Sequence, residues 1–219
     1  MSVDPMILSL EIAVLATAIT AIVGIGLGYA LARWRWPGRD LLDAIIAAPM
    51  VLPPTVLGYY VLVAVGRHSA IGRAYERLFG ETIVFTVTGA VLAAALGSLP
   101  LVVKAARAAF ESVDPTLIAA ARTLGASPAR AFFTVAVPLA APGLVGGLML
   151  GFARALGDFG VTLMVAGDIP GETQTASLAI YDAIQAGRED DAATMSIVIT
   201  AGAIAVLYLV NKLRARSDG

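Results

Sequence analysis

The stretch "TLIAAARTLGASPARAFFTVAVPL" (Thr116–Leu139) is a structured, basic interruption in a chain that is otherwise strongly apolar. Hydrophobic residues make up 58% of the 219 residues and charged residues only 14%, against roughly 25% charged in ordinary soluble domains. This composition indicates an integral membrane protein with a single domain and argues against a soluble one. The interruption therefore separates the membrane spans before it from those after it.

Helix signals stand at both ends of the interruption. Asp114 and Pro115 form an N-cap carboxylate followed by proline at the first helical position, and Gly125 suits the left-handed conformation that ends a helix. A serine-proline pair two residues later repeats the start signal. The pattern predicts a short helix over 115–124, a turn, and a second helix.

Five apolar segments are long enough to cross the hydrocarbon core of a bilayer, which takes about 20 helical residues. We expect an all-α protein whose single transmembrane domain covers residues 7–212, with spans at about 7–32, 41–66, 82–103, 139–166 and 192–210. The loop 104–138 then lies between the third and fourth spans. A short external helix is expected after the fourth span, ending near Gly187.

The distribution of basic residues predicts the orientation, because short cytoplasmic loops are enriched in Lys and Arg. With the N-terminus outside, the inner segments hold Arg33, Arg35, Arg39, Lys104, Arg107, Arg122, Arg130, Lys212, Arg214 and Arg216, and the outer segments hold Arg67, Arg73, Arg77 and Arg188. This excess favours an external N-terminus and a cytoplasmic C-terminus. Lys104 and Arg107 are expected to reach to the inner interface with their charged ends.

Two interpretations of the helix at 115–124 stay open from its own residues. It is too short to span the membrane, and its small side chains at Ala119 and Ala120 suit a groove on another protein. Alternatively, it is a linker that lies on the lipid headgroups, anchored by Phe132 and Phe133.

The same loop resembles that of the permease subunits of ATP-binding-cassette importers that work with a separate solute-binding protein. Their pattern is Glu-Ala-Ala, three residues, Gly, nine residues, and Ile-x-Leu-Pro. Here Ala120 and Ala121 match the paired alanines, Gly125 follows at the right distance, and Pro138 closes the pattern. Ala119 replaces the expected glutamate, and two valines replace the two aliphatic residues.

Two further stretches resemble the molybdate branch of that family, namely "APMVLPPTVLGYYVLVAVG" (48–66) and "FARALGDFGVTLMVAGDIPGETQTASLAIYDAIQ" (152–185). The likeness covers nearly the whole chain, and it ranks molybdate first, tungstate second and sulfate third. Asp158 stands where the related motif more often has glutamate.

The resemblance implies a subunit of an ATP-driven importer in the cytoplasmic (inner) membrane of a prokaryote. Its implied partners are a second copy of the chain, two cytoplasmic ATPase subunits that receive the short helix, and an external molybdate-binding protein. ATP and Mg are then held by the ATPase subunits, and the chain itself carries no catalytic residue, cofactor or metal. No partner is a nucleic acid.

Residues of the spans suggest a pathway or gate. Pro53 and Pro54 remove two amide donors within a span, which predicts a kink or break beside a cavity, with Thr55 able to supply a hydroxyl. Arg154 and Asp158, four residues apart, can pair on one helix face. A plain packing kink and a structural ion pair are the alternatives to contact with the transported anion.

A stripe of small residues marks the fourth span. Gly143, Gly147, Gly151 and Ala155 recur every four residues and allow close approach of another helix. Whether this helix belongs to the same subunit or to a second copy is open at this stage.

Motifs that the chain lacks bear on the class of function. The sequence contains no G-x-x-x-x-G-K-[ST] phosphate loop, no H-E-x-x-H and no G-x-S-x-G. The classes that remain beside an importer subunit are an ion-coupled carrier or channel and a passive membrane scaffold. Neither explains the broken span together with the capped helix, and a carrier would usually show internal repeats.

Overall fold

The computed structural model describes residues 4–217, and every regular element within them is helical. The elements are α1 (Pro5–Arg33), α2 (Arg39–Val51), α3 (Pro54–Val65), α4 (Ala70–Phe79), α5 (Val87–Glu111), α6 (Pro115–Thr123), α7 (Pro128–Ala131), η1 (Phe132–Ala136), α8 (Val137–Leu156), α9 (Gly160–Ala166), α10 (Ala176–Gln185) and α11 (Glu189–Ser217). The side chains of Arg214 and Arg216, two of the basic residues predicted to be cytoplasmic, lie outside the described residues.

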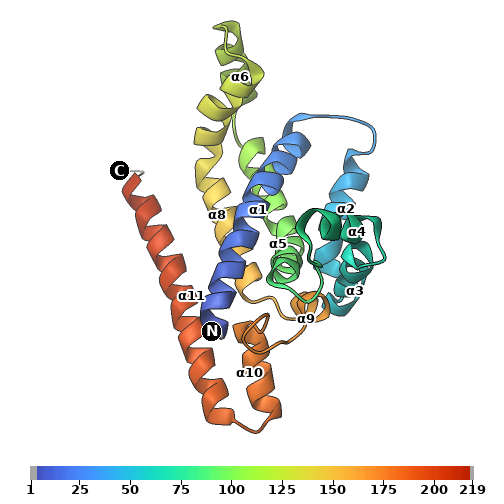
Figure 1. Cartoon of the computed structure of the whole chain (residues 1–219). Helices are drawn as coiled ribbons and strands as arrows, with labels where there is room; N and C mark the ends of the chain where they lie inside the picture. The colour runs from blue at the N-terminus through green and yellow to red at the C-terminus, as the bar shows by residue number, and fades with distance from the viewer. Residues whose placement is uncertain (1–3, 218–219) are drawn as a thin grey trace.

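Among the described residues, four helices are long and apolar enough to cross a membrane: α1, α5, the continuous helix Pro128–Leu156 and α11. The bent pair α2 and α3 makes a fifth crossing if it is taken as one span. Figure 1 places α6 at one end of the bundle and α10 at the other, with the N- and C-termini toward opposite ends. This confirms the expected all-α transmembrane fold.

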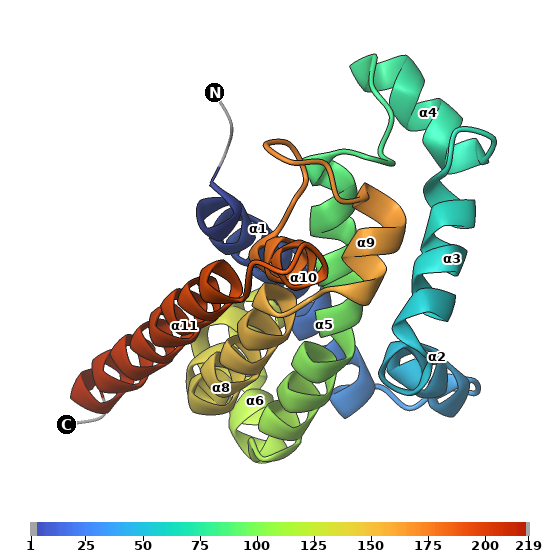
Figure 2. The ribbon, with the colours of Figure 1, turned by 90° about the horizontal axis from the view of Figure 1, so that it is seen from below.

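Helix α5 forms the centre of the bundle (Figures 1 and 2) and packs against α1, α8, α2 and α9. Its side chains are small where neighbours approach, as at Ala90, Ala93 and Ala94, which are fully buried. By contrast, the most apolar stretch of α11 has no buried residue. The core therefore lies around α5, and α11 is peripheral.

The small-residue stripe of α8 packs within the same subunit. Gly143, Gly147 and Gly151 face Ala109, Ala105 and Val102 of α5. A Cβ at Gly147 would lie only 2.5 Å from the Cβ of Ala105, so the two helices touch where side chains are absent. This contact decides the question that the sequence left open.

Several predicted span boundaries differ from the structure. The third span begins later, at Val87, because Thr86 caps the helix by accepting from the amide of Gly89 at 3.4 Å. It also continues past Lys104 to Glu111, since acidic partners neutralise the basic residues there. The loop predicted at 104–138 is correspondingly shorter.

The helix that contains most of the predicted fourth span, 139–166, has different bounds at both ends. This helix starts at Pro128, after Ser127 caps it, and stops at Leu156. Residues 157–159 interrupt the helix, and the rest of the predicted span forms the separate helix α9. The predicted single span 41–66 is likewise two helices, bent by 118°.

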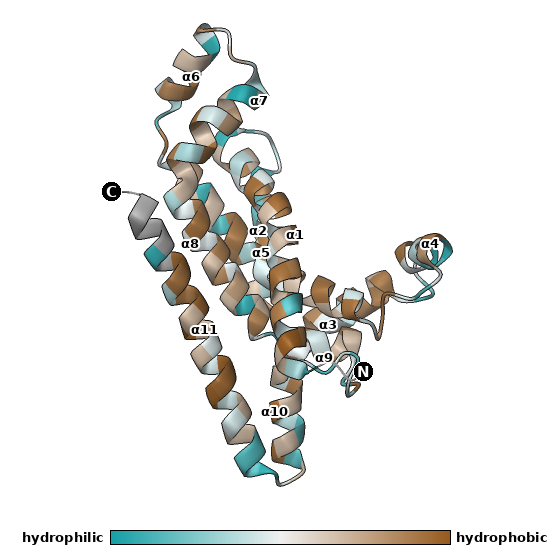
Figure 3. Ribbon diagram, turned by 60° about the vertical axis from the view of Figure 1, so that its left-hand side comes forward, coloured by the Kyte–Doolittle hydropathy of each residue, from teal (hydrophilic) through white to brown (hydrophobic). Residues whose placement is uncertain are grey.

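One helix was not predicted. Residues 67–81 were expected to be an outer loop, but α4 occupies much of this segment and projects from the bundle (Figure 3). Its signals are local, since Ser69 caps its start and Gly80 ends it with a φ of 76°. The short helix predicted after the fourth span is present as α10, and it ends beside Gly187 as expected.

Candidate functional site

Helix α6 is built by the capping residues that the sequence indicated. The carboxylate of Asp114 accepts a hydrogen bond from the amide of Thr116 at 2.8 Å, and Pro115 occupies the first helical position. This hydrogen bond holds the pKa of Asp114 below its ordinary value, because it favours the ionised carboxylate. The helix therefore starts at a defined residue.

The other end of α6 closes in a Schellman motif. Gly125 has a φ of 88°, which strongly favours glycine. The amide of Ala126 donates to the carbonyl of Ala121 at 3.1 Å, and the amide of Gly125 donates to that of Arg122 at 3.0 Å. The predicted helix and turn are confirmed, with the end of the helix moved by one residue.

Within the described residues, α6 is covered only in part, where Ile118 packs against the cluster around Phe110 and Phe132. None of its residues is buried, and Leu124, directly after it, is 88% exposed. Of the two rings predicted to anchor the loop on the headgroups, Phe132 packs inward against Tyr29, whereas Phe133 is 67% exposed. The helix presents an uncovered surface at the end of the bundle (Figure 1).

The base of the loop is tied to three spans. Arg33 of α1 donates to the carbonyl oxygens of Phe110 and Val113 at 2.8 and 2.7 Å. The rings of Tyr29, Phe110 and Phe132 meet with centroids 4.7 to 5.9 Å apart. From the sequence, Arg33 is predicted only to be a basic residue near the inner end of a span. In the structure it joins α1 to the point where α5 leads into α6.

The residues that match the loop pattern of the importer permeases lie on or next to the base formed by Arg33 and the three aromatic rings. Ala120 is exposed and Ala121 is half-buried, both on α6. Pro138 stands in the first turn of α8, directly after the π-helical turn η1. Proline cannot donate to the preceding turn, so a wider turn is favoured just before it.

The helix break at Pro53 and Pro54 lies against the break between α8 and α9, at residues 157–159. Helix α3 starts at Pro54 and packs against α9. A Cβ at Gly160 would lie 2.6 Å from the Cβ of Pro54, and one at Gly58 would lie 2.6 Å from that of Met164. The predicted break is confirmed, and the two interrupted segments are in contact.

Arg154 and Asp158 form the predicted ion pair, with 3.0 Å between Nη1 and Oδ1. Asp158 is 3% exposed, and its other oxygen accepts from the amide and the hydroxyl of Thr162 at 3.0 and 2.7 Å. The carboxylate thereby fixes the first turn of α9 to the end of α8. This geometry is that of a structural pair, and contact with an anion stays a prediction.

A second charged cluster was not predicted. Both oxygens of Asp43 on α2 accept from Lys104 at 2.7 Å, and one accepts from Arg107 at 3.1 Å. Arg107 also bonds Glu111 at 2.8 Å. The two basic side chains thus pair with α2 and α5 instead of reaching only for the interface. Opposite charges far apart in sequence gave no local signal for this cluster.

The candidate residues therefore form two groups. Ala120, Ala121 and Gly125 belong to the loop at one end of the bundle, and Pro138 stands in the first turn of α8, which follows that loop. The second group, Pro53, Pro54, Thr55, Arg154 and Asp158, lies around the contact of α3, α8 and α9. Thr55 is exposed at the start of α3. Among the described residues, no group of three or more His, Cys, Asp or Glu is arranged to hold a metal ion.

Comparison with known proteins covers almost the whole chain. Residues 7–217 match the family described as "Binding-protein-dependent transport system inner membrane component". The chain is 45% identical to the molybdenum transport system permease protein ModB of Escherichia coli (strain K12), over 96% of this chain and 92% of that protein. It is 43% identical to ModB of Haemophilus influenzae, over 90% and 86% of the two chains.

More distant relatives and solved structures also match most of the chain. The sulfate transport system permease protein CysT of Salmonella typhimurium is 32% identical, over 93% of this chain and 73% of that protein. Among solved structures, an inward-facing MetNI methionine ABC transporter matches with a TM-score of 0.67 at 19% identity, over 95% of this chain and 90% of that chain. A bacterial ABC transporter for alginate import matches with a TM-score of 0.71 at 14% identity, over 96% and 79%.

Proposed function

The chain belongs to the family of binding-protein-dependent transport system inner membrane components and is a permease subunit of such an importer, and from this premise we propose that its substrate is molybdate. The support is the gradient of identity, which falls from 45% with a molybdenum permease to 32% with a sulfate permease. Tungstate is the second candidate and sulfate the third.

The observation that carries the coupling role is the uncovered, doubly capped helix α6. We propose that each of two cytoplasmic ATPase subunits receives one such helix, in a complex with two copies of this chain. ATP and Mg are bound by the ATPase subunits, and this chain hydrolyses no ATP. An external molybdate-binding protein delivers the anion.

The proposed orientation has an external N-terminus. It is supported by the basic residues Arg33, Lys104 and Arg107, which lie at the same end of the bundle as α6. Movement of the ATPase subunits would pass through α6 to the base held by Arg33 and the three aromatic rings, and from there to α1, α5 and α8. The contact of α3 with α9 would then be repositioned.

Replacing Gly125 by valine tests the coupling role. A β-branched residue in the left-handed conformation costs about 1–2 kcal/mol, so we expect weaker binding of the ATPase subunits and a several-fold loss of ATP-dependent uptake. Gly187→Val is the matched control, because Gly187 also has a positive φ, of 71°, but lies between α10 and α11. Equal effects of the two variants on ATPase binding would contradict the proposal.

The substrate is tested in proteoliposomes that contain the chain, its ATPase and its binding protein. We expect ATP-dependent uptake of radiolabelled molybdate, with competition by excess tungstate and little by excess sulfate. Competition by sulfate as strong as that by unlabelled molybdate would overturn the substrate assignment and leave the coupling role unaffected.

A further inference from the structure

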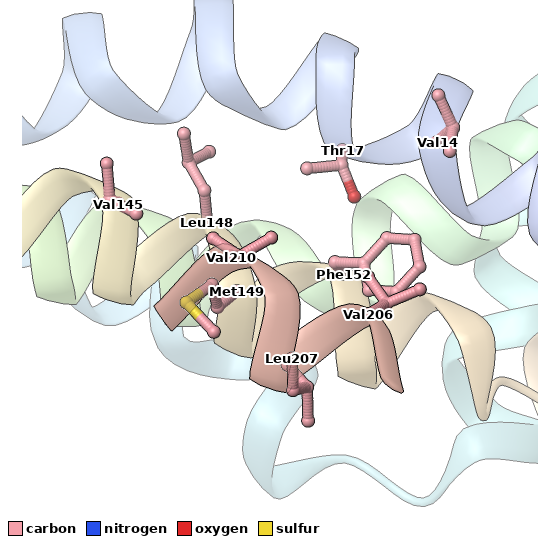
Figure 4. Close-up of a pocket in the computed structure, with 9 residues that line it drawn as sticks. All are labelled: Val14, Thr17, Val145, Leu148, Met149, Phe152, Val206, Leu207 and Val210. Atoms are coloured by element: carbon pink, nitrogen blue, oxygen red, sulfur yellow. The ribbon is translucent and has the colours of Figure 1, made fainter. Parts of the chain in front are cut away.

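A groove separates the peripheral helix α11 from the face formed by α1 and α8 (Figure 4). One cavity of about 350 Å³ lies between Val14 and Thr17 of α1, Leu148 and Phe152 of α8, and Val206 and Val210 of α11. A second cavity of about 170 Å³ shares Phe152 and Val206 with it and extends toward Met6. The two cavities are therefore neighbouring sections of one groove.

The lining of the groove offers no partner to a polar ligand. Its side chains are apolar except for Thr17, and the hydroxyl of Thr17 already donates to the carbonyl of Ala13 at 2.6 Å. An apolar cavity of this kind does not hold ordered water, because water needs two or more polar partners. The groove therefore suits an apolar occupant such as a hydrocarbon chain.

The length of the groove matches one leaflet of a bilayer. From Met6 to Thr17, α1 rises about 16 Å, and α8 rises as far from Val145 to Leu156. Half of the hydrocarbon core is about 15 Å thick. Under the proposed orientation the α1 and α8 segments lie toward the outer leaflet, because they are the N-terminal half of α1 and the C-terminal half of α8, and the lining residues of α11 extend from there toward the middle of the membrane, as far as Val210.

Helix α11 is held mainly at its outer end, where it packs against α10. It makes only slight contact with α8, and Figure 3 shows it running along the outside of the bundle. The space beside it therefore opens directly to the surrounding lipid. A chain of methylene groups would supply the van der Waals contacts that α11 lacks.

We propose that this groove binds one acyl chain of a bilayer phospholipid, which joins α11 to the α1 and α8 face. The lipid is a structural ligand of the permease and takes no part in moving the substrate. The proposal depends on the membrane position of these helices and not on the identity of the transported anion.

Native mass spectrometry of the full chain, purified in mild detergent from vesicles of phosphatidylethanolamine and phosphatidylglycerol, tests the proposal. We expect one tightly retained phospholipid per chain. Ala203→Phe fills the groove and should lower retention at least threefold. Ala205→Phe is the matched control, because Ala205 is exposed, lies two residues away on α11 and does not line the groove.

If Ala203→Phe does not fold, Gly202→Phe takes its place, since a Cβ at Gly202 meets open space. Equal retention in the groove and control variants would overturn the proposal, and so would a wild-type chain that carries no phospholipid.

Fluorescence quenching provides an independent measurement. Phe152→Trp is made in a chain whose Trp34 and Trp36 are replaced by Phe, and vesicles contain phospholipid brominated along the acyl chain. Quenching of the groove tryptophan should persist after bulk lipid is exchanged for unbrominated lipid, whereas that of Ile204→Trp, at an exposed position of α11, should be lost. Occupation by a helix of a second copy would leave the groove tryptophan unquenched, and water would shift its emission to the red. Either result would overturn the proposal.

Discussion

Removing the carboxylate of Asp158 is expected to release α9 from the end of α8. The side chain is 3% exposed, pairs with Arg154 and accepts two hydrogen bonds from Thr162. In Asp158→Ala all three donors lose their acceptor. Since α9 packs against α3, the contact between the two interrupted segments should loosen with it.

The size of the effect follows from which donors can find another partner. The side chain of Arg154 is 35% exposed and can turn to solvent, so the ion pair itself contributes little. The amide of Thr162 is buried and cannot turn to solvent. An unsatisfied buried donor of this kind costs about 1–3 kcal/mol. Together with the displaced hydroxyl of Thr162, we expect a loss of about 2–4 kcal/mol in the free energy of unfolding, which lowers Tm by roughly 4–16 °C for a chain of this length.

Thermal unfolding of the full chain in detergent or in nanodiscs measures this change. Asp158→Asn should lie between the wild type and Asp158→Ala, because the amide oxygen can still accept from Thr162. Asp182→Ala is the control, since Asp182 pairs with Arg188 at 3.3 Å but both side chains are more than half exposed, and such pairs contribute about 0–1 kcal/mol. Equal shifts in Tm for the two alanine variants would refute the reasoning.

Three further predictions concern the bundle and the loop. Gly147→Leu should cost about 1–3 kcal/mol by overpacking α8 against α5, whereas Gly146→Leu, at a site with open space, should leave Tm nearly unchanged. Asp114→Ala should uncap α6 and reduce ATPase binding in a pull-down, and Asp114→Asn should preserve it. Because the pKa of Asp114 is lowered on folding, its stabilising effect is present above the ordinary carboxylate pKa. The effect is lost only as the pH falls through the lower pKa of the folded state. A loss of ATPase binding already near neutral pH would contradict this account. Asp43→Ala should lower Tm and make it less dependent on salt, because it leaves Lys104 and Arg107 without their partner on α2; an unchanged salt dependence would contradict this.

Much of the fold could be predicted because its signals are local. The caps at Asp114 and Gly125 depend on hydrogen bonds and dihedral angles within a few residues, so they identify α6 without reference to the rest of the chain. The break at Pro53 follows from missing amide donors, and the pairing of Arg154 with Asp158 follows from helical spacing. Length and hydropathy alone indicated the spans.

The span ends were less well predicted, for a physical reason. A basic residue such as Lys104 looks like the end of a span, yet the helix continues when a distant carboxylate neutralises the charge. Similarly, the apolar run of the fourth span continues through residues 157–159, but there the chain turns into α9.

The sequence by itself determined a helical membrane protein with a capped loop helix, a proline break and a charged pair, because each depends on neighbours in the chain. Only the tertiary structure decided how these parts meet. Arg33 bonds the carbonyl of Val113, Gly160 lies against Pro54, and Asp43 pairs with Lys104. These contacts join residues tens of positions apart, and they exist because packing around α5 brings the helices together, which no local pattern records.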